Sequence, residues 1–221
     1  MHEEGVREFV RQAFVCPADV ADQLLARGAV RAYPPQAVIV RQGEPLVQCY
    51  LLMLGRARAL LYTAGGQVIL LHEYHGGDIF GALGGADAAR QDADVVVVEE
   101  ARALVMHGAH LAMLAEQHGC IGLALSRLLV QRLRKATEQL FERSGLSSVG
   151  RIHAELLRQA RLRRDLTISP APVLADLALV VATTRETASR AVGALERRGI
   201  IRREGDALIV VAPHRLEEMI L

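Results

Sequence analysis

The sequence predicts an α+β protein, in which a small all-β barrel or sandwich is followed by a long amphipathic helix and a second, mainly helical domain. Three observations predict it. Short β-rich segments alternate with glycine-rich turns over residues 37–106. Leucines recur three or four residues apart between residues 121 and 140. A helix, turn, helix and hairpin pattern then occupies residues 173–211. We place the domains at residues 1–113, 114–146 and 147–221, with a hinge at Ser144-Gly145-Leu146-Ser147-Ser148.

Composition limits the class of protein. The chain has 221 residues, of which 51% are hydrophobic and 23% charged, as expected of a globular protein with a real core rather than a disordered or collagen-like chain. It has no apolar run long enough to span a membrane and no signal peptide at its start, so we expect a cytoplasmic protein. Cys16, Cys49 and Cys120 are odd in number and far apart, which fits reduced thiols rather than a disulfide framework or a zinc site.

Charge is distributed unevenly along the chain. Residues 1–113 carry 9 Lys and Arg against 13 Asp and Glu, whereas residues 145–221 carry 12 against 9. An acidic front and a basic back indicate that only the back half approaches a polyanion.

The front half begins with short helices and continues as strands. Helical apolar spacing covers residues 6–14, and a second short helix is expected at residues 19–26. Strands are expected at residues 37–40, 48–54, 57–62, 68–74, 95–98 and 101–106, with turns at residues 42–45, 64–66, 75–78 and 84–87 between them. After a short helix at residues 110–116, the pattern becomes that of a long helix.

The long helix, near residues 117–143, carries a leucine seam. This seam is longer than a small barrel can cover, so we expect a parallel, coiled-coil-like homodimer interface. The alternative is a core helix packed on its own barrel. The residues of the predicted seam are Ile121, Leu125, Leu128, Leu129, Leu133, Ala136 and Leu140.

The C-terminal part carries the most informative pattern. Residues 173–181 and 185–197 have helical spacing and are joined by Ala182-Thr183-Thr184. On the second helix one stripe is apolar and packs inward, while the opposite face carries Arg185, Glu186, Ser189 and Arg190. Two guanidinium groups and a carboxylate suit a helix in the DNA major groove, because they complement guanine O6 and N7 and the cytosine amine. The inward stripe consists of Ala188, Ala191, Val192 and Leu195.

Two alternatives stay open for this face. Thr183 and Glu186 fit the T-x-x-E capping box, so Glu186 alternatively only caps the helix. Arg185 and Arg190 alternatively belong to an ordinary solvated face.

Two short β segments, at residues 200–203 and 207–211, follow the second helix and are joined by Glu204-Gly205-Asp206. Together with the helices, they predict a winged helix-turn-helix. Arg202 and Arg203 on the hairpin are predicted to contact DNA phosphates, as are Thr183 and Thr184 at the helix start.

The whole pattern resembles the cyclic-AMP receptor protein/FNR (Crp/Fnr) family of bacterial transcription regulators. The motifs that carry the resemblance are Gln42-Gly43-Glu44 followed by Tyr50-Leu51-Leu52 and Gly55, then Gly77-Asp78-Ile79-Phe80-Gly81, then Arg185-Glu186-Thr187 with Arg190. It implies an N-terminal double-stranded β-helix, a jelly-roll or cupin-like β-roll. It also implies a homodimer that binds a palindromic double-stranded DNA site with TGTGA-like half-sites. RNA polymerase is a further candidate partner, and no enzyme activity is expected.

The sequence departs from the cyclic-nucleotide-binding members at the implied effector pocket. Where those members have Gly-Glu-Leu, with the Glu on the ribose, this chain has Gly81-Ala82-Leu83. Where they have Arg-Ser on the cyclic phosphate, it has Asp92-Ala93, and an anion there repels the phosphate. We therefore expect that cyclic AMP does not bind. The alternative is that Arg90 supplies the missing cation through a shifted loop.

The sequence gives no clear site for the other cofactors of the family. Three scattered cysteines cannot hold the four-thiolate iron–sulfur cluster of the FNR branch. No cofactor or metal is predicted, although haem binding through a histidine is an alternative, and so is another ligand-responsive sensor. A cupin-type metalloenzyme is a remote alternative, because His72 and His75 lie three residues apart and point to opposite faces of a strand. The candidate haem ligands are His72, His75, His107 and His110, for which ordinary surface or core positions are the other interpretation.

Overall fold

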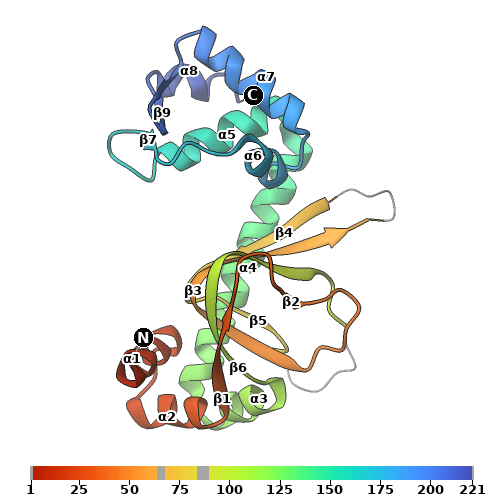
Figure 1. The fold of residues 1–221 in the computed structure, drawn as a ribbon, viewed down its shortest axis with the longest axis vertical. Coiled ribbons are helices and arrows are strands. Elements are labelled where there is room, and N and C mark those ends of the chain that lie inside the picture. The colour runs from red at the N-terminus through yellow and green to blue at the C-terminus, as the bar shows by residue number, and fades with distance from the viewer. Residues whose placement is uncertain (1, 64–67, 84–89, 221) are drawn as a thin grey trace. The chain divides into compact units, whose positions relative to one another are not determined.

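The computed structural model describes residues 2–63, 68–83 and 90–220 (Figure 1). The chain divides into two compact units, Met1–Arg134 and Lys135–Leu221, and each unit has its own hydrophobic core. The turns expected at residues 64–66 and 84–87 lie outside the described residues. None of the described helices is long and apolar enough to cross a membrane.

The first unit begins with two short amphipathic helices, α1 (Glu3–Phe14) and α2 (Ala18–Ala26). The apolar face of α1 buries Val6, Val10 and Phe14, which recur at helical spacing. The helices expected from the sequence in this region are confirmed.

A six-stranded antiparallel sheet follows. Its strands are β1 (Gly28–Tyr33), β2 (Val38–Val40), β3 (Gln48–Tyr62), β4 (Val68–Tyr74), β5 (Ile79–Gly81) and β6 (Asp94–His107). The order is β1-β6-β3-β4, with β2 paired to β6 and β5 paired to β3. Alternation along β3 builds two cores from one strand. Cys49 and Leu51 join the helices in one core, while Tyr50 and Leu52 face the other core inside the sheet.

Four of the predicted strands merge into two longer ones. Residues 48–54 and 57–62 form the single strand β3, and residues 95–98 and 101–106 form the single strand β6. Gly55 has φ +81°, and the pairing of β3 with β6 shifts register around it. A Cβ at Gly55 would lie 2.1 Å from the Glu100 carbonyl oxygen. Glycine therefore lets the strand pass through a bulge without ending. The strands β1 and β5 were not predicted.

Two helices complete this part of the chain, α3 (Gly108–Gln117) and α4 (Gly119–Gly145). The first turns of α4 bury Ile121 and Leu125 in the same core as α1 and α2. The long helix expected near residues 117–143 is confirmed, and it spans 27 residues.

The second unit contains four helices and a three-stranded sheet among its described residues. They are α5 (Ser148–Ala160), β7 (Thr167–Ile168), α6 (Leu174–Val180), α7 (Arg185–Arg197), β8 (Ile201–Glu204), β9 (Ala207–Val210) and α8 (Pro213–Glu217), with strand order β7-β9-β8. Ser147 caps α5 by accepting a hydrogen bond from the Gly150 N–H at 3.0 Å. The helices and hairpin predicted here are confirmed, and α7 has the predicted bounds. The core packs Ile152, Leu156, Leu177, Leu195 and Leu208 together.

Candidate DNA-binding surface and effector pocket

The helix α7 is held by its apolar stripe. Ala188, Ala191, Val192 and Leu195 are all buried and belong to the core of the second unit. The sequence places them on one side of the helix, so packing this stripe against α5 and α6 leaves the other side to solvent.

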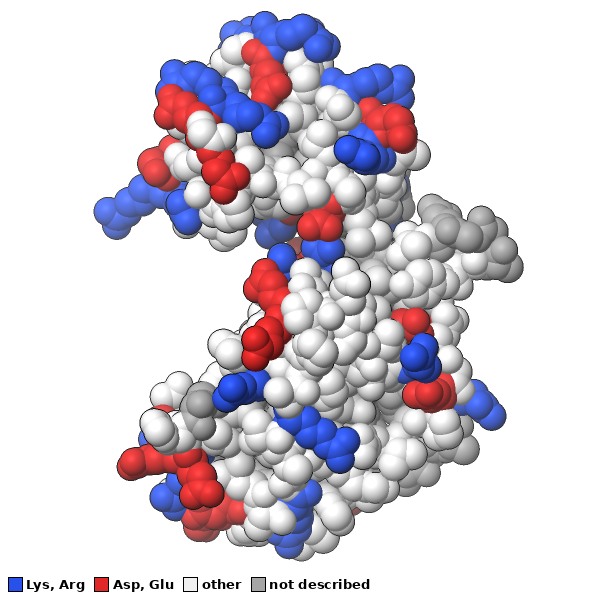
Figure 2. All heavy atoms as spheres, in the orientation of Figure 1, with Lys and Arg blue, Asp and Glu red and all other residues white. Residues whose placement is uncertain are grey.

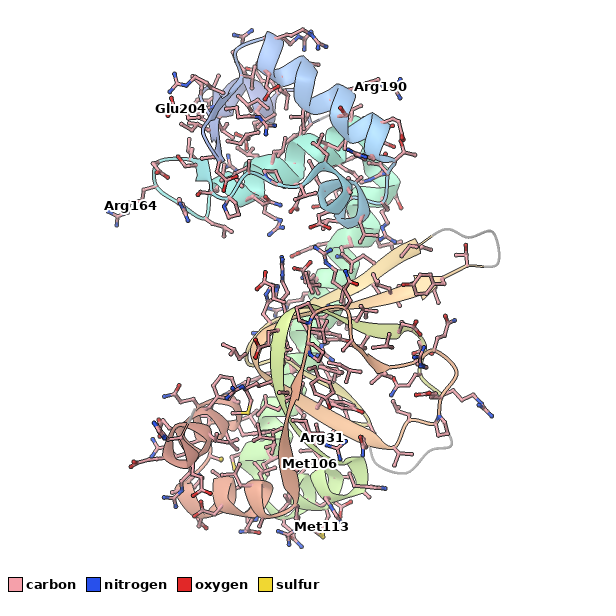
Figure 3. All side chains as sticks on the ribbon, in the orientation of Figure 1. Arg31, Met106, Met113, Arg164, Arg190 and Glu204 are labelled. Atoms are coloured by element: carbon pink, nitrogen blue, oxygen red, sulfur yellow. The ribbon has the colours of Figure 1, made fainter. Side chains whose placement is uncertain are left out.

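The four residues predicted to contact bases lie on that solvent side. Arg185, Glu186, Ser189 and Arg190 are all exposed, and Figure 3 shows Arg190 projecting from α7 away from the rest of the unit. Among the described residues, neither Arg185 nor Arg190 forms a salt bridge. Both guanidinium groups are therefore available to an external acceptor. Figure 2 shows Lys and Arg side chains along the outer edge of this unit, interspersed with acidic groups.

The predicted capping box at the start of α7 is wrong by one residue. The N-cap is Thr184, whose hydroxyl accepts a hydrogen bond from the Thr187 N–H at 3.2 Å. Thr183 belongs to the preceding turn, where its N–H donates to the Ala178 carbonyl at 2.9 Å. Thr184 is thus the first residue in position to cap the helix.

The Glu186 carboxylate, in the first turn of α7, interacts with hydrogen-bond donors and with two arginines. Its own backbone N–H and the Thr184 hydroxyl lower the pKa of its carboxyl below the usual 4.5, and Arg185 and Arg190 lower it further. The carboxylate is therefore charged at neutral pH and is both exposed and close to the N-terminus of the helix.

The hairpin arginines are exposed but paired. Arg202 lies 2.6 Å from a Glu204 carboxylate oxygen, and Arg203 lies 3.3 Å from one of Glu196. Exposed pairs of this kind contribute only about 0–1 kcal/mol. Phosphate groups of DNA can therefore compete for both cations.

The predicted effector pocket lies in the first unit, and residues 84–89 within it are outside the described part. Ala82 is buried, and its N–H donates to the Gln48 carbonyl at 2.9 Å. Asp92 is exposed and Ala93 is buried in the core inside the sheet. Ala82 carries no carboxylate, and neither Asp92 nor Ala93 carries a cation. The third residue of the first motif, Leu83, is half-buried beside the core of the helices.

Arg90 already has a partner. Its guanidinium donates to the Gly43 carbonyl at 2.7 Å, next to an isolated bridge between Arg90 and Pro45. The side chain is exposed and serves the loop that contains Gly43.

Aromatic rings stack inside the β-roll. The ring centroids of Tyr50 and Phe80 are 5.0 Å apart, and those of Tyr74 and Phe80 are 4.5 Å apart. From α4, the Arg132 guanidinium lies 5.4 Å from the centroid of the Tyr74 ring and donates to the Ile79 carbonyl. Burial raises the pKa of Tyr74. This stack and its cation connect α4 to the sheet.

The candidate haem ligands have local roles. His107 caps α3 by accepting from the Ala109 N–H at 3.1 Å, and its ring lies 5.8 Å from that of His110. His72 contacts Tyr74, and His75 lies 4.0 Å from the Glu73 carboxylate. In the described ranges no group of three or more His, Cys, Asp or Glu residues is arranged to hold a metal ion.

The three cysteines are free thiols within cores or beside them. Cys16 and Cys49 are buried, and Cys120 is half-buried. Burial raises the pKa of Cys49 to about 12.

Two sets of residues were missed by the sequence analysis. Arg151 makes four hydrogen bonds, two of them to the turn between α6 and α7 and two to Leu146 and Ser148, and no local pattern marks it. Leu123 and Val130 are exposed on α4, although their spacing of seven residues was a signal in the sequence.

A β-roll, a long helix and a helix-turn-helix with an exposed basic face together are typical of a DNA-binding transcription regulator. Two family models match the chain in that order. They are the cyclic nucleotide-binding domain at residues 30–118 and the Crp-like helix-turn-helix domain at residues 141–219. The chain belongs to the Crp/Fnr family of transcription regulators.

Curated relatives agree with this family. The cyclic AMP receptor protein of Thermus thermophilus is 30% identical over 176 residues, which cover 78% of this chain and 79% of that protein. A CRP-like cAMP-activated global transcriptional regulator of Mycobacterium tuberculosis is 26% identical over 195 residues, covering 83% and 84%. These relatives are regulators rather than enzymes.

Solved structures support the fold. A CooA mutant from Carboxydothermus hydrogenoformans superposes with a TM-score of 0.78 at 17% identity, covering 90% of both chains. The c-di-GMP responsive global regulator CLP from Xanthomonas campestris gives a TM-score of 0.74 at 18% identity, covering 88% of this chain and 99% of that one.

Proposed function

We propose that this protein is a homodimeric, sequence-specific DNA-binding regulator whose β-roll does not respond to cyclic AMP. The observation that carries the proposal is the division of α7 into a buried apolar stripe and an exposed face with Arg185, Glu186 and Arg190. Such a helix presents bidentate donors and one acceptor at a spacing that fits the major groove.

The base contacts follow from hydrogen-bond chemistry. Arg185 and Arg190 each donate to guanine O6 and N7, Glu186 accepts from a cytosine amine, and Ser189 contacts a neighbouring base edge. Phosphates are contacted by Thr183, Thr184, Arg202 and Arg203. The resemblance of these positions to the family motif implies a TGTGA-like half-site.

The dimer interface is assigned to the exposed face of α4. Leu123, Val130 and Leu133 are 51%, 48% and 69% exposed. They fall on positions of a heptad that continues in sequence at Leu140, which is 66% exposed. An exposed apolar stripe at heptad spacing is stabilised by a second copy of the same helix. A two-fold dimer also matches two half-sites one helical turn apart, about 34–36 Å.

The seam expected from the sequence divides into two faces. Ile121 and Leu125 are buried in the core of their own unit, and Leu128 packs against that core. Ile121 and Leu125 therefore offer a partner little apolar surface, and Leu128 is only partly exposed. Leu129, Leu133 and Leu140 are exposed and remain in the proposed interface or on its border.

Cyclic AMP does not fit the described pocket residues. The side chain of Ala82 has no acceptor for a ribose hydroxyl. By spacing from the family motif, the Asp92 carboxylate takes the position of the cation that binds the phosphate. Titration calorimetry with cyclic AMP on the full chain should show no binding at micromolar concentrations. Binding that is lost in Arg90→Ala would overturn this and favour the shifted-loop alternative.

Selection from random double-stranded DNA tests the function itself. The wild-type protein should enrich a palindrome, and Arg185→Ala and Arg190→Ala should each weaken binding by roughly 1–3 kcal/mol and relax one base pair per half-site. Failure to enrich any sequence would overturn the proposal. RNA polymerase is the natural further partner of such a regulator, and an absorption spectrum of the isolated protein tests the haem alternative.

A further inference from the structure

We infer that Arg151 is the residue that positions α7, because its guanidinium fastens the turn between α6 and α7 to the end of α4. This inference rests on the proposed DNA-binding function. Arg151 lies in the first turn of α5 and is half-buried. Its partners all lie within the second unit.

The guanidinium of Arg151 joins two helix ends. Nε donates to the Val181 carbonyl at 2.9 Å and Nη2 to the Ala182 carbonyl at 3.2 Å, where α6 finishes. Nη1 donates to the Leu146 carbonyl at 3.0 Å, one residue after α4 ends. Carbonyl groups at helix C-termini lack partners within the helix and carry partial negative charge. One planar cation therefore satisfies the ends of two helices at once.

The fourth contact completes the cluster. Nη2 also lies 3.4 Å from the Ser148 hydroxyl oxygen. No described carboxylate pairs with Arg151 in a salt bridge, so its charge is balanced by carbonyl dipoles. A lysine ammonium is a compact point charge and cannot reproduce the planar fork that reaches these separate acceptors.

The turn that Arg151 holds sets the start of α7. Ala182 has φ +52°, a left-handed conformation that disfavours alanine and persists only when its surroundings impose it. Thr183 and Thr184 follow directly, and Thr184 is the N-cap of α7. Loss of the hydrogen bond to the Ala182 carbonyl therefore lets Thr183 and Thr184 move. These two residues orient the first turn of α7, where the predicted base contacts begin.

The consequence concerns the spacing of half-sites. If α7 is fastened to the end of α4, and the part of α4 that contains Leu140 lies in the dimer, the clamp restricts the separation of the two α7 helices. The protein then discriminates between half-site spacings, in addition to reading bases. Without the clamp each α7 still reads its half-site, but the spacing preference broadens.

Two measurements on the full chain test the role of Arg151. In Arg151→Lys, hydrogen exchange at residues 181–184 should become at least about tenfold faster, because the Ala182 and Thr183 amides are protected only while the turn is closed. On a spacer series built from the selected site, the variant should lose about tenfold or more in affinity at the optimal spacing, comparable to the loss of a base contact. It should lose little at spacings one base pair longer or shorter. Affinity for random-sequence DNA should stay within about twofold of wild type, since phosphate contacts are intact.

The matched control is Arg158→Lys, the same substitution on the same helix. Arg158 is 61% exposed and pairs with Glu155 at 2.6 Å, and this variant should match wild type in both measurements. A role in stability alone would lower affinity for all spacings equally, in proportion to the unfolded fraction. If Arg151→Lys does not fold by circular dichroism, Ser148→Ala removes one acceptor and should move both readouts in the same direction by a smaller amount.

The outcomes separate the two hypotheses. Unchanged exchange at residues 181–184 in a folded Arg151→Lys overturns the clamp, whether or not DNA binds. Faster exchange with an unchanged spacing preference overturns its positioning role. If the wild-type chain enriches no DNA sequence, the proposed function fails, and the exchange measurement alone still decides whether Arg151 holds the turn.

Discussion

Arg203 Nε lies 3.3 Å from Glu196 Oε1, so a salt bridge joins the hairpin to the last turn of α7. The cation in this pair is one that the hairpin would offer to a DNA phosphate. Both side chains are exposed, so the pair is weak and a phosphate can replace the carboxylate. The neighbouring Arg202 is held in the same way by Glu204. Local carboxylates thus partly offset the positive charge of the hairpin in the free protein.

The hairpin arginines should determine salt dependence rather than sequence preference. Arg202→Ala should weaken binding to all sequences alike and make the slope of log affinity against log salt shallower by about one unit, because one phosphate contact is lost. Glu196→Gln should raise affinity for random DNA by freeing Arg203. Fluorescence anisotropy between 50 and 200 mM salt, about the range over which phosphate contacts dominate, checks both. A steeper loss at one base pair than at others would show that Arg202 contacts a base instead.

Loss of the Thr184 hydroxyl, but not of the Thr183 hydroxyl, should destabilise the start of α7. Thr184→Ala removes the acceptor of the Thr187 N–H and should destabilise the chain by about 0.5–2 kcal/mol. Thr183→Ala is the matched control and should cost less, because the hydrogen bond at that position uses the Thr183 backbone N–H. Urea unfolding followed by circular dichroism measures both. Equal losses would mean that the two hydroxyls share the cap.

The second unit was predicted closely because each of its signals is local. The apolar stripe at Ala188, Ala191, Val192 and Leu195 predicts the helix α7, whose observed ends match the predicted ones. The hairpin is predicted by Glu204-Gly205-Asp206 at its turn. The start of α7 was misjudged by one residue, since both Thr183 and Thr184 are good caps. The left-handed conformation of Ala182 keeps Thr183 in the preceding turn, so that Thr184 becomes the N-cap.

The predictions failed where contacts are distant or patterns overlap. Gly55 predicts a break between strands, but its neighbours across the sheet turn it into a bulge. On α4, two apolar stripes overlap in sequence, so residues such as Leu125 and Leu133 were assigned to one seam although one is buried and the other exposed. Arg151 could not be found from the sequence, because three of its four acceptors are backbone carbonyls, two of them 30 and 31 residues away. Every residue has a backbone carbonyl, so such acceptors give no sequence signal.

The exposed stripe of α4 should control oligomeric state. Val130→Glu with Leu133→Glu places charges in the proposed interface, and sedimentation should shift from about twice 24.0 kDa to the monomer mass. Affinity for the palindromic site should fall when the dimer dissociates, because each half-site must then bind a separate molecule. Gln131→Glu adds one negative charge beside the stripe at an exposed position and should leave the dimer intact. A wild-type chain that sediments as a monomer at micromolar concentration would contradict the assignment.

Glu186 provides the sharpest test, because in the proposed function it both stabilises the first turn of α7 and contacts a base. Its pKa lies below 4.5 in the folded chain, so its favourable interactions are fully present above 4.5 and are lost as the pH falls through the lower native value. At neutral pH the carboxylate is charged and able to accept from a cytosine amine. Glu186→Gln keeps a side chain of the same shape that can still accept a hydrogen bond from the helix end, but it removes the charge. Selection from random DNA should then lose its preference for the guanine–cytosine pair at one position per half-site, while Ser189→Ala retains it. An unchanged preference in Glu186→Gln would mean that Glu186 only caps the helix, and Arg185 and Arg190 would then carry the readout without it.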